Sequence, residues 1–147
     1  MPPNATMLVR LLYASRVAEP APSDSVHDIV RQSQAHNAQH GITGNLCYSD
    51  KVFMQVLEGG RGAVNALYAR IVRDARHTDV MLLHYEEITE RRYASWSMGQ
   101  ANLAKVNPAT LLRFFDLAQL NPHAVSGKNS LALMEELMAS ACIVGRP

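Results

Sequence analysis

Residues 42–59, ITGNLCYSDKVFMQVLEG, constrain the fold of this chain more than any other stretch. Two runs rich in strand-forming residues flank Ser49-Asp50-Lys51, which predicts an antiparallel hairpin with its turn at these residues. The second run, residues 52–57, is apolar except at Gln55, so it predicts a buried strand. The Gln55 carboxamide carries two donors and two acceptor lone pairs, and a core must satisfy them. The ordinary partners of such a group are a backbone group or a buried water.

The segments around this hairpin alternate between strand-like and helix-like periodicity. Apolar residues on one face of 7–15 (Met7, Val9, Leu11 and Tyr13) predict a first strand, and Gly41 is placed to end the helix that follows. The order strand, helix, strand, strand, helix, strand, strand is typical of a ferredoxin-like α+β sheet with both helices on one face. Besides the hairpin, the predicted elements are a strand at 7–15, a helix from Ser23 or Asp24 to His40, a helix at 61–73, and strands at 79–88 and 97–103.

The last third of the chain predicts helices only. Asn107-Pro108 opens a helix through Leu111, Phe115 and Leu117, and a second helix is expected over 130–143. Both are amphipathic, so they either cover the second face of the sheet or contact a partner.

Length and charge limit the classes of protein to which the chain can belong. A length of 147 residues with 48% hydrophobic residues suits one domain with a small helical appendix. A net charge of +1 without a basic stripe argues against nucleic acid or anionic membrane as the main partner. We find no signal peptide and no apolar run of membrane-spanning length, which predicts a soluble cytoplasmic protein. Cys47 and Cys142 have no metal-like spacing and are expected to be buried free thiols.

Polar residues of several predicted elements converge on one face of the sheet. Strand alternation places Gln55 with Phe53 and Leu57, and Tyr13 ends the first strand. The inward stripe of the first helix is Val26, Val30, Ser33 and Asn37, of which Ser33 and Asn37 are expected to face the cleft. On the second helix, Arg70, Asp74 and the following His77 fall at i, i+4 and i+7 and are expected to face the same cleft. Such a cleft suits a flat heteroaromatic ligand with a polar tail. The alternative is that Arg70 and Asp74 form a solvated pair and Tyr13 is ordinary core.

Other motifs give little support to other functions. The stretch GGRGAV lacks the GK[ST] of a phosphate-binding loop. His36 and His40 have a metal-compatible spacing without an evident third ligand, so we predict no metal site. No serine or cysteine lies in a recognisable nucleophile elbow.

Four stretches, in their order and spacing, carry a family resemblance: LVRLLYASR, SQAHNAQHGITGNLCYSDKVFMQVLEG, RDARH and RRYASWSMG. They resemble the BLUF family of blue-light receptors, which bind FAD, over residues 7–102. The resemblance implies a photosensory domain at 7–102 and a C-terminal helical segment at 103–147 for output and oligomerisation. It implies FAD as cofactor, with FMN or riboflavin as possible substitutes. One departure is GGRG at 59–62, where the family often has a proline-containing turn.

The resemblance also assigns photochemical roles. Tyr13 corresponds to the tyrosine that gives an electron to the excited flavin, and Gln55 to the glutamine between that tyrosine and the flavin N5 and C4 carbonyl. Blue light would rotate or tautomerise the Gln55 amide and shift the flavin band modestly to the red. Trp96 and Met98 correspond to the last-strand residues that relay this change towards the C-terminal helices.

The remaining assignments concern cofactor binding. Asn37 corresponds to the asparagine that binds the other carbonyl edge of the flavin ring, and His36 to its neighbour packed near the ring. His36 also departs from the family in part, because an asparagine occurs at this position as well. Further contacts to the flavin or its ribityl-phosphate tail are expected from Ser33, Arg70, Asp74, Arg76 and His77.

The output is less constrained than the sensor. No cyclase, phosphodiesterase or DNA-binding segment follows the sheet. We therefore expect a photoreceptor without enzymatic activity that acts through a homodimer, a larger homo-oligomer or a separate signalling protein. The alternatives are a flavin-dependent oxidoreductase and a non-photoactive ferredoxin-like scaffold.

Overall fold

A computed structural model describes residues 6–18, 25–49, 51–94 and 98–140. Five strands form one mixed sheet in the order β4-β1-β3-β2-β5, antiparallel except for the parallel pair of β2 and β5. The sequence-predicted α+β order is confirmed. The strands are β1 (Leu8–Val17), β2 (Thr43–Tyr48), β3 (Val52–Gly60), β4 (His77–Glu87) and β5 (Gly99–Asn102).

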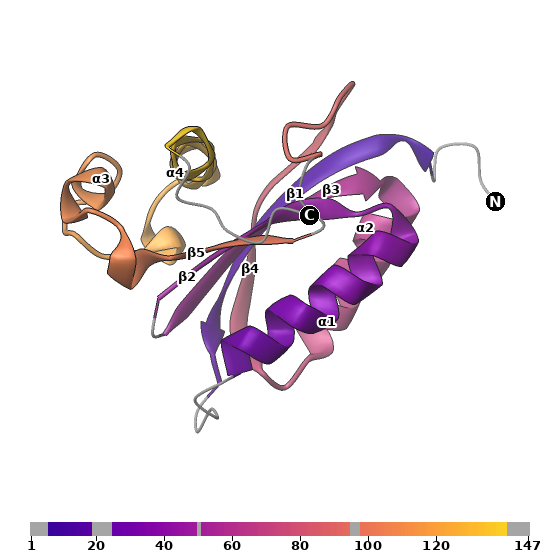
Figure 1. Cartoon of the computed structure of the whole chain (residues 1–147), viewed down its shortest axis with the longest axis horizontal. Coiled ribbons are helices and arrows are strands. Elements are labelled where there is room, and N and C mark those ends of the chain that lie inside the picture. Colours follow the sequence, from indigo (N-terminus) through magenta and orange to yellow (C-terminus); the bar gives the residue numbers. More distant parts are fainter. Residues whose placement is uncertain (1–5, 19–24, 50, 95–97, 141–147) are drawn as a thin grey trace.

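Helices cover both faces of the sheet. Helix α1 (Ser25–His40) and helix α2 (Arg61–Arg73) lie on one face, as the ferredoxin-like topology predicts, whereas α3 (Pro108–Leu112) and α4 (Gly127–Ala139) lie on the other side (Figure 1). Gly41 ends α1 with a φ of 66°, the left-handed conformation that glycine adopts without strain. Helix α2 starts after Gly60 without a side-chain cap, and the Arg61 amide donates instead to the Met7 carbonyl at 2.8 Å.

Each face of the sheet has its own hydrophobic core. Between the sheet and the helices α1 and α2, the core contains Val9, Leu11 and Tyr13 on alternate positions of β1. Met7, predicted on this face, precedes β1 and is 42% exposed. The other core contains Leu12 and Val56 of the sheet, and it is closed by α4 side chains. These α4 side chains are Leu131, Leu133, Met134 and Leu137.

The C-terminal helices differ in extent from the prediction. Helix α3 ends at Leu112, although its predicted helix continues beyond Leu117, which is 58% exposed. The chain turns after Leu112, and the Asn129 side chain donates to the Phe114 carbonyl at 2.8 Å. This tertiary bond replaces a helical one, and Phe115 is still buried. Helix α4 begins earlier than predicted, at Gly127, because the Ser126 hydroxyl accepts the Asn129 amide at 3.1 Å as an N-cap.

A tight contact between neighbouring strands fixes the β2–β3 hairpin. A Cβ added at Gly44 would meet the Val56 carbonyl oxygen at 2.0 Å, so only glycine fits this position. Directly beside it, Asn45 pairs with Val56, and Leu46 pairs with Gln55. In the described ranges, no helix is long and apolar enough to cross a membrane.

Candidate functional site

A pocket lies over the sheet, between helices α1 and α2. Its floor is formed by Tyr13 of β1 and Gln55 of β3, which are directly opposite each other in the antiparallel ladder. Apolar side chains of both helices form its walls, and charged side chains gather at its mouth. The other lining residues are Ile29, Gln32, Ser33, His36, Leu67, Arg70, Ile71, Asp74, Arg76 and His77.

The Gln55 carboxamide sits in the centre of a three-residue hydrogen-bonded chain. The Tyr13 hydroxyl donates to Gln55 Oε1, and Gln55 Nε2 donates to Met98 Sδ at 3.1 Å. Tyr13, Gln55 and Met98 are 1%, 3% and 0% exposed. These contacts use one donor and one acceptor of the amide, so one further donor and one further lone pair remain for another group. Turning the amide by half a rotation would exchange its donor and acceptor sides.

Tyr13 is held as a neutral phenol. Burial, with a smaller effect from the neighbouring Tyr68 and Asp74, raises the pKa of Tyr13 well above its usual range. Its ring centroid lies 5.7 Å from that of Tyr68 on α2 and 6.3 Å from that of His77. A buried phenol that donates to an amide loses an electron more easily when its proton can move along that hydrogen bond. The geometry therefore suits coupled transfer of an electron and a proton.

At the mouth of the pocket, two histidines and an arginine connect the helices. Arg70 of α2 donates to His36 Nδ1 at 3.1 Å, and the His36 ring stacks on His40 at 4.2 Å. Partial burial, together with the nearby His40 and Arg70, lowers the pKa of His36. A neutral His36 ring can accept the hydrogen bond from Arg70, which keeps the guanidinium at the pocket mouth.

The predicted single stripe of Arg70, Asp74 and His77 is wrong in its geometry. Helix α2 ends at Arg73, Asp74 is its extended C-cap, and His77 begins β4. The alternative, a solvated pair of Arg70 with Asp74, is not what the structure has, because Asp74 pairs with Arg76, with a closest contact of 2.6 Å. This pairing, above all, lowers the pKa of Asp74 to about 2. The turn nevertheless brings these residues to the same pocket.

His77 closes the inner end of the pocket as a buried ring. One of its nitrogens, Nδ1, lies 2.7 Å from the Ser15 hydroxyl, and its ring centroid is 5.2 Å from that of Phe53. Burial is the main cause that lowers the pKa of His77, opposed by Asp74. The lowered pKa favours the neutral form of this imidazole.

The inward stripe predicted for the first helix agrees with the structure where its side chains are described, but only part of it lines the pocket. Asn37 is fully buried and, unlike Ser33, is not among the lining residues; Val30 is also buried. Sequence reasoning missed Ile29 and Gln32, which line the pocket. The sequence signal for Ile29 was its i, i+4 spacing with Ser33, which places the two side chains on the same face of the helix.

Some residues that the sequence analysis singled out have no described side chain. Val26, Trp96 and Cys142 lie outside the residues whose side chains are described. Cys47 is a free, buried thiol, as predicted. Searching the described residues for metal-binding groups of three or more His, Cys, Asp or Glu side chains finds none.

The pocket combines apolar side chains with buried and solvent-exposed polar groups. Ile29 on one side and Leu67 and Ile71 on the other can enclose a flat ring. The Gln55 amide and the Tyr13 phenol line the pocket as buried groups, and Arg70 and Arg76, which are exposed and partly buried respectively, add guanidinium groups to its lining. Such an arrangement suits a flat heteroaromatic ligand with an anionic tail.

Comparison with known proteins agrees with this chemistry. Residues 8–99 match the family model described as sensors of blue-light using FAD. The chain belongs to the BLUF family. BLUF domains bind FAD and sense blue light, so this chain contains a flavin-dependent photosensory domain. The expected family, fold and cofactor are thereby confirmed.

Relatives include both short and long BLUF proteins. The chain is 40% identical over 97 residues to photoactivated adenylate cyclase subunit beta of Euglena gracilis, covering 65% of this chain and 11% of that protein. The chain thus spans about a tenth of the length of this relative. Its fold is similar to BlrB in the dark state (32% identity, TM-score 0.76, 93% of this chain and 98% of that chain). It is also similar to BlsA in its photo-activated state (30% identity, TM-score 0.79, 90% and 95%).

Proposed function

We propose that this chain converts blue light into a change in the hydrogen bonding of Gln55, with Tyr13 as the donor of an electron and a proton. Bound FAD would supply the light absorption and the electron acceptor. The observation that carries the proposal is the buried chain of Tyr13, Gln55 and Met98 at the floor of the pocket.

Each group has a task that follows from its position. Tyr13 would give an electron to the light-excited cofactor, and its phenolic proton would move along the hydrogen bond to the Gln55 carboxamide. When the electron returns, a proton returns to Tyr13 with it, and the neutral amide is left rotated or as its tautomer, so its donor to Met98 Sδ is withdrawn. Because Gln55 is buried, the loss of this contact without a new partner costs free energy, since water does not reach the amide. The two states of the amide thus have different hydrogen-bond partners. A group with two such alternative states can act as a switch.

The surrounding residues would bind and orient the cofactor. Ile29, Leu67 and Ile71 would cover the ring, and Arg70 and Arg76 would bind the phosphate groups. Asn37 of α1 would bind the second carbonyl edge of the ring, and its neighbour His36 would pack near the ring, as the family resemblance implies. Ser33, Asp74 and His77 would complete the enclosure.

The output would pass through the C-terminal segment. We propose a photosensory unit at 7–102 and an output segment at 103–147, with Met98 and Trp96 as the relay between them. Signalling would use a homo-oligomer or a separate cytoplasmic partner, without enzymatic activity of this chain. Supporting this, α4 packs on the sheet face opposite the pocket, and Leu112 and Leu117 are 55% and 58% exposed.

The test is the visible absorption spectrum of the FAD-loaded chain, recorded in the dark and directly after a blue flash. We expect a flavin band that moves to the red and relaxes in the dark. A flavin-loaded chain with an unchanged spectrum would contradict the switch. Bleaching of its flavin by NADPH in the dark would then favour the oxidoreductase, and a chain that binds no FAD would favour the scaffold.

A further inference from the structure

Two buried polar pairs cross the β1–β3 ladder, three residues apart. Tyr13 lies opposite Gln55, and Arg10 lies opposite Glu58. Because successive side chains of a strand alternate between faces, the two pairs point to opposite sides of the sheet. The Tyr13–Gln55 pair faces the pocket, and the Arg10–Glu58 pair faces the side that carries α4. Arg10 is 3% exposed and Glu58 is 0% exposed.

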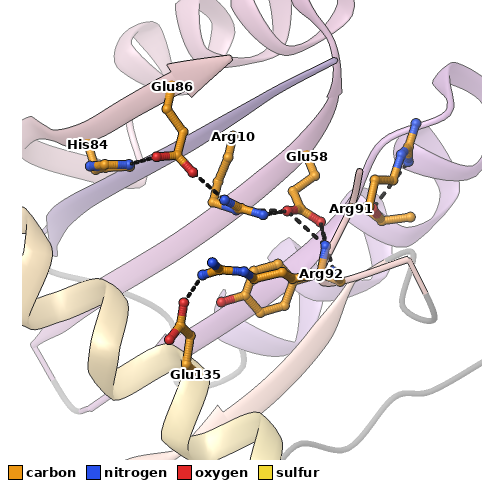
Figure 2. Close-up of polar contacts among 9 residues, drawn as sticks. Arg10, Glu58, His84, Glu86, Arg91, Arg92 and Glu135 are labelled. Atoms are coloured by element: carbon orange, nitrogen blue, oxygen red, sulfur yellow. Dashed lines mark hydrogen bonds and ion pairs between the residues drawn. The ribbon is translucent and has the colours of Figure 1, made fainter. Parts of the chain in front are cut away.

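The Glu58 carboxylate contacts four nitrogen donors. Arg10 contacts the carboxylate through Nε at 2.8 Å and Nη2 at 2.7 Å. The backbone amides of Arg92 and Tyr93 donate to the same carboxylate at 3.0 Å and 2.8 Å (Figure 2). Arg10 also contacts Glu86 of β4. The Glu58 carboxylate therefore fixes the backbone of residues 92 and 93 against the centre of the sheet.

The stretch that follows reaches the other face of the sheet. Tyr93 belongs to the core beneath α4, whereas Met98 belongs to the core beneath α1 and α2. Met98 contacts Gln55 Nε2 through its sulfur, and its carbonyl accepts from Gln34 of α1 at 3.1 Å. One short stretch of chain is thus bonded to β3 near both ends, to Glu58 on one face and to Gln55 on the other.

The same stretch also contacts helix α4. The Arg92 guanidinium pairs with Glu135 of α4, and these side chains are 51% and 41% exposed (Figure 2). Arg91 donates to the Thr43 hydroxyl of β2 at 3.2 Å. Of these contacts, the exposed Arg92–Glu135 pair is the weakest, because water competes for both charges. The buried Glu58 contacts are the strongest, because breaking them would leave a charge without a partner.

We propose that Glu58 is a positioning residue for the Gln55–Met98 contact, and that the Arg92–Glu135 pair transmits the state of this contact to α4. The inference rests on the proposed switching of Gln55. When Met98 loses its donor, we expect Met98 to shift relative to the backbone of Arg92 and Tyr93, which Glu58 holds. The four donors of Glu58 stay in place because these contacts are buried and strong. The shift therefore breaks the weaker, exposed contact, and the Arg92 and Glu135 side chains separate. Helix α4 then exchanges its amide hydrogens faster.

The positioning role is tested in the dark with Glu58→Gln in the FAD-loaded full chain. The readout is the ¹³C-methyl resonance of Met98, with FAD stoichiometry as the check of folding. We expect full FAD binding, a displaced Met98 resonance and a dark recovery changed by about fivefold, the effect of one hydrogen bond on a barrier. If this variant does not fold, the Arg10→Gln/Glu58→Gln pair removes both charges together. An unchanged Met98 resonance and recovery rate in the folded variant would overturn the positioning role.

The transmission is tested by hydrogen exchange of Gly127–Ala139 in the dark and under blue light. We expect illumination to speed exchange in the wild type, and Arg92→Ala, Glu135→Ala and their double variant to lose this light dependence equally. Arg113→Ala is the matched control, because Arg113 also pairs with α4, through Glu136 at 2.8 Å, but comes from the C-cap of α3. It should keep the light dependence.

The two hypotheses fail in different ways. A wild-type chain without a red shift contradicts the proposed switch. A normal red shift with light-independent exchange in α4, or with full light dependence in Arg92→Ala, contradicts only the transmission through Arg92 and Glu135.

Discussion

Gln55 Nε2 lies 3.1 Å from Met98 Sδ, while Oε1 of the same amide accepts the Tyr13 hydroxyl. Sulfur is a weak acceptor compared with oxygen. The Nε2 contact is therefore the more easily exchanged of the two. A new acceptor next to the amide, such as a ligand carbonyl, can compete with Met98 for this donor.

Replacing Gln55 by Leu should leave FAD bound and abolish the light-induced red shift. Leucine keeps much of the side-chain volume, but it removes every hydrogen bond of the amide. The measurement is the difference spectrum after a blue flash at matched flavin occupancy. Gln39→Leu, at an exposed position of α1, is the matched control and should cycle normally. A normal red shift in Gln55→Leu would show that the amide is not the switch.

Tyr13→Phe should stop the photocycle because the electron and proton donor is lost. The unpaired Gln55 oxygen should also lower the free energy of unfolding by about 1–3 kcal/mol. Flash absorption and denaturant unfolding measure the two effects separately. Because the ring centroids of Tyr68 and Tyr13 are 5.7 Å apart, residual cycling that disappears in Tyr13→Phe/Tyr68→Phe would identify Tyr68 as a second donor.

Gly44→Ala should destabilise the fold by about 3 kcal/mol or more, because its Cβ would overlap the Val56 carbonyl oxygen. Gly41→Ala is the comparison. It has open space around it, but a φ of 66°, so we expect a loss of about 1–2 kcal/mol from backbone strain alone. Urea unfolding of both variants gives the ranking. Equal losses would contradict the tight β2–β3 contact.

Protonation of His77 should lower the stability of the fold as the pH falls. Its pKa is lowered in the folded state, so below about pH 6.5 the unfolded chain binds more protons than the folded one. The stability from the neutral ring is present above about pH 6.5, and it is lost as the pH falls towards the folded pKa, by at most about 1.4 kcal/mol per pH unit. Unfolding free energies between pH 7 and 5 measure this slope. His77→Gln should flatten it, and an identical slope would assign the effect to other groups.

The local elements and one face of the site could be read from the sequence. Alternating apolar residues indicated β1, a continuous apolar run indicated β3, and strand parity put Tyr13 and Gln55 on the side of α1 and α2. Glycine at position 41 ended α1 where expected. These features depend on residues that are close in the chain, so their periodicity is visible without knowledge of distant contacts.

Helical periodicity failed at two helix ends, one set by a pair of residues close in the chain and the other by a distant contact. Asp74 ends α2 as its C-cap, and its carboxylate pairs with Arg76, so the predicted i, i+4, i+7 stripe does not continue. Helix α3 stops at Leu112, and the Phe114 carbonyl is satisfied by Asn129 of α4. A local pattern cannot indicate that a side chain distant in sequence supplies the hydrogen bond.

By itself, the sequence determined the alternation of strands and helices and the buried amide at Gln55. Only the tertiary structure decided what that amide contacts and how Glu58 and Arg92 connect it to α4. The physical reason is that hydrogen bonds between residues such as Gln55 and Met98 depend on the strand order β4-β1-β3-β2-β5. That order results from packing two cores against one sheet, and no periodicity within a single element encodes it.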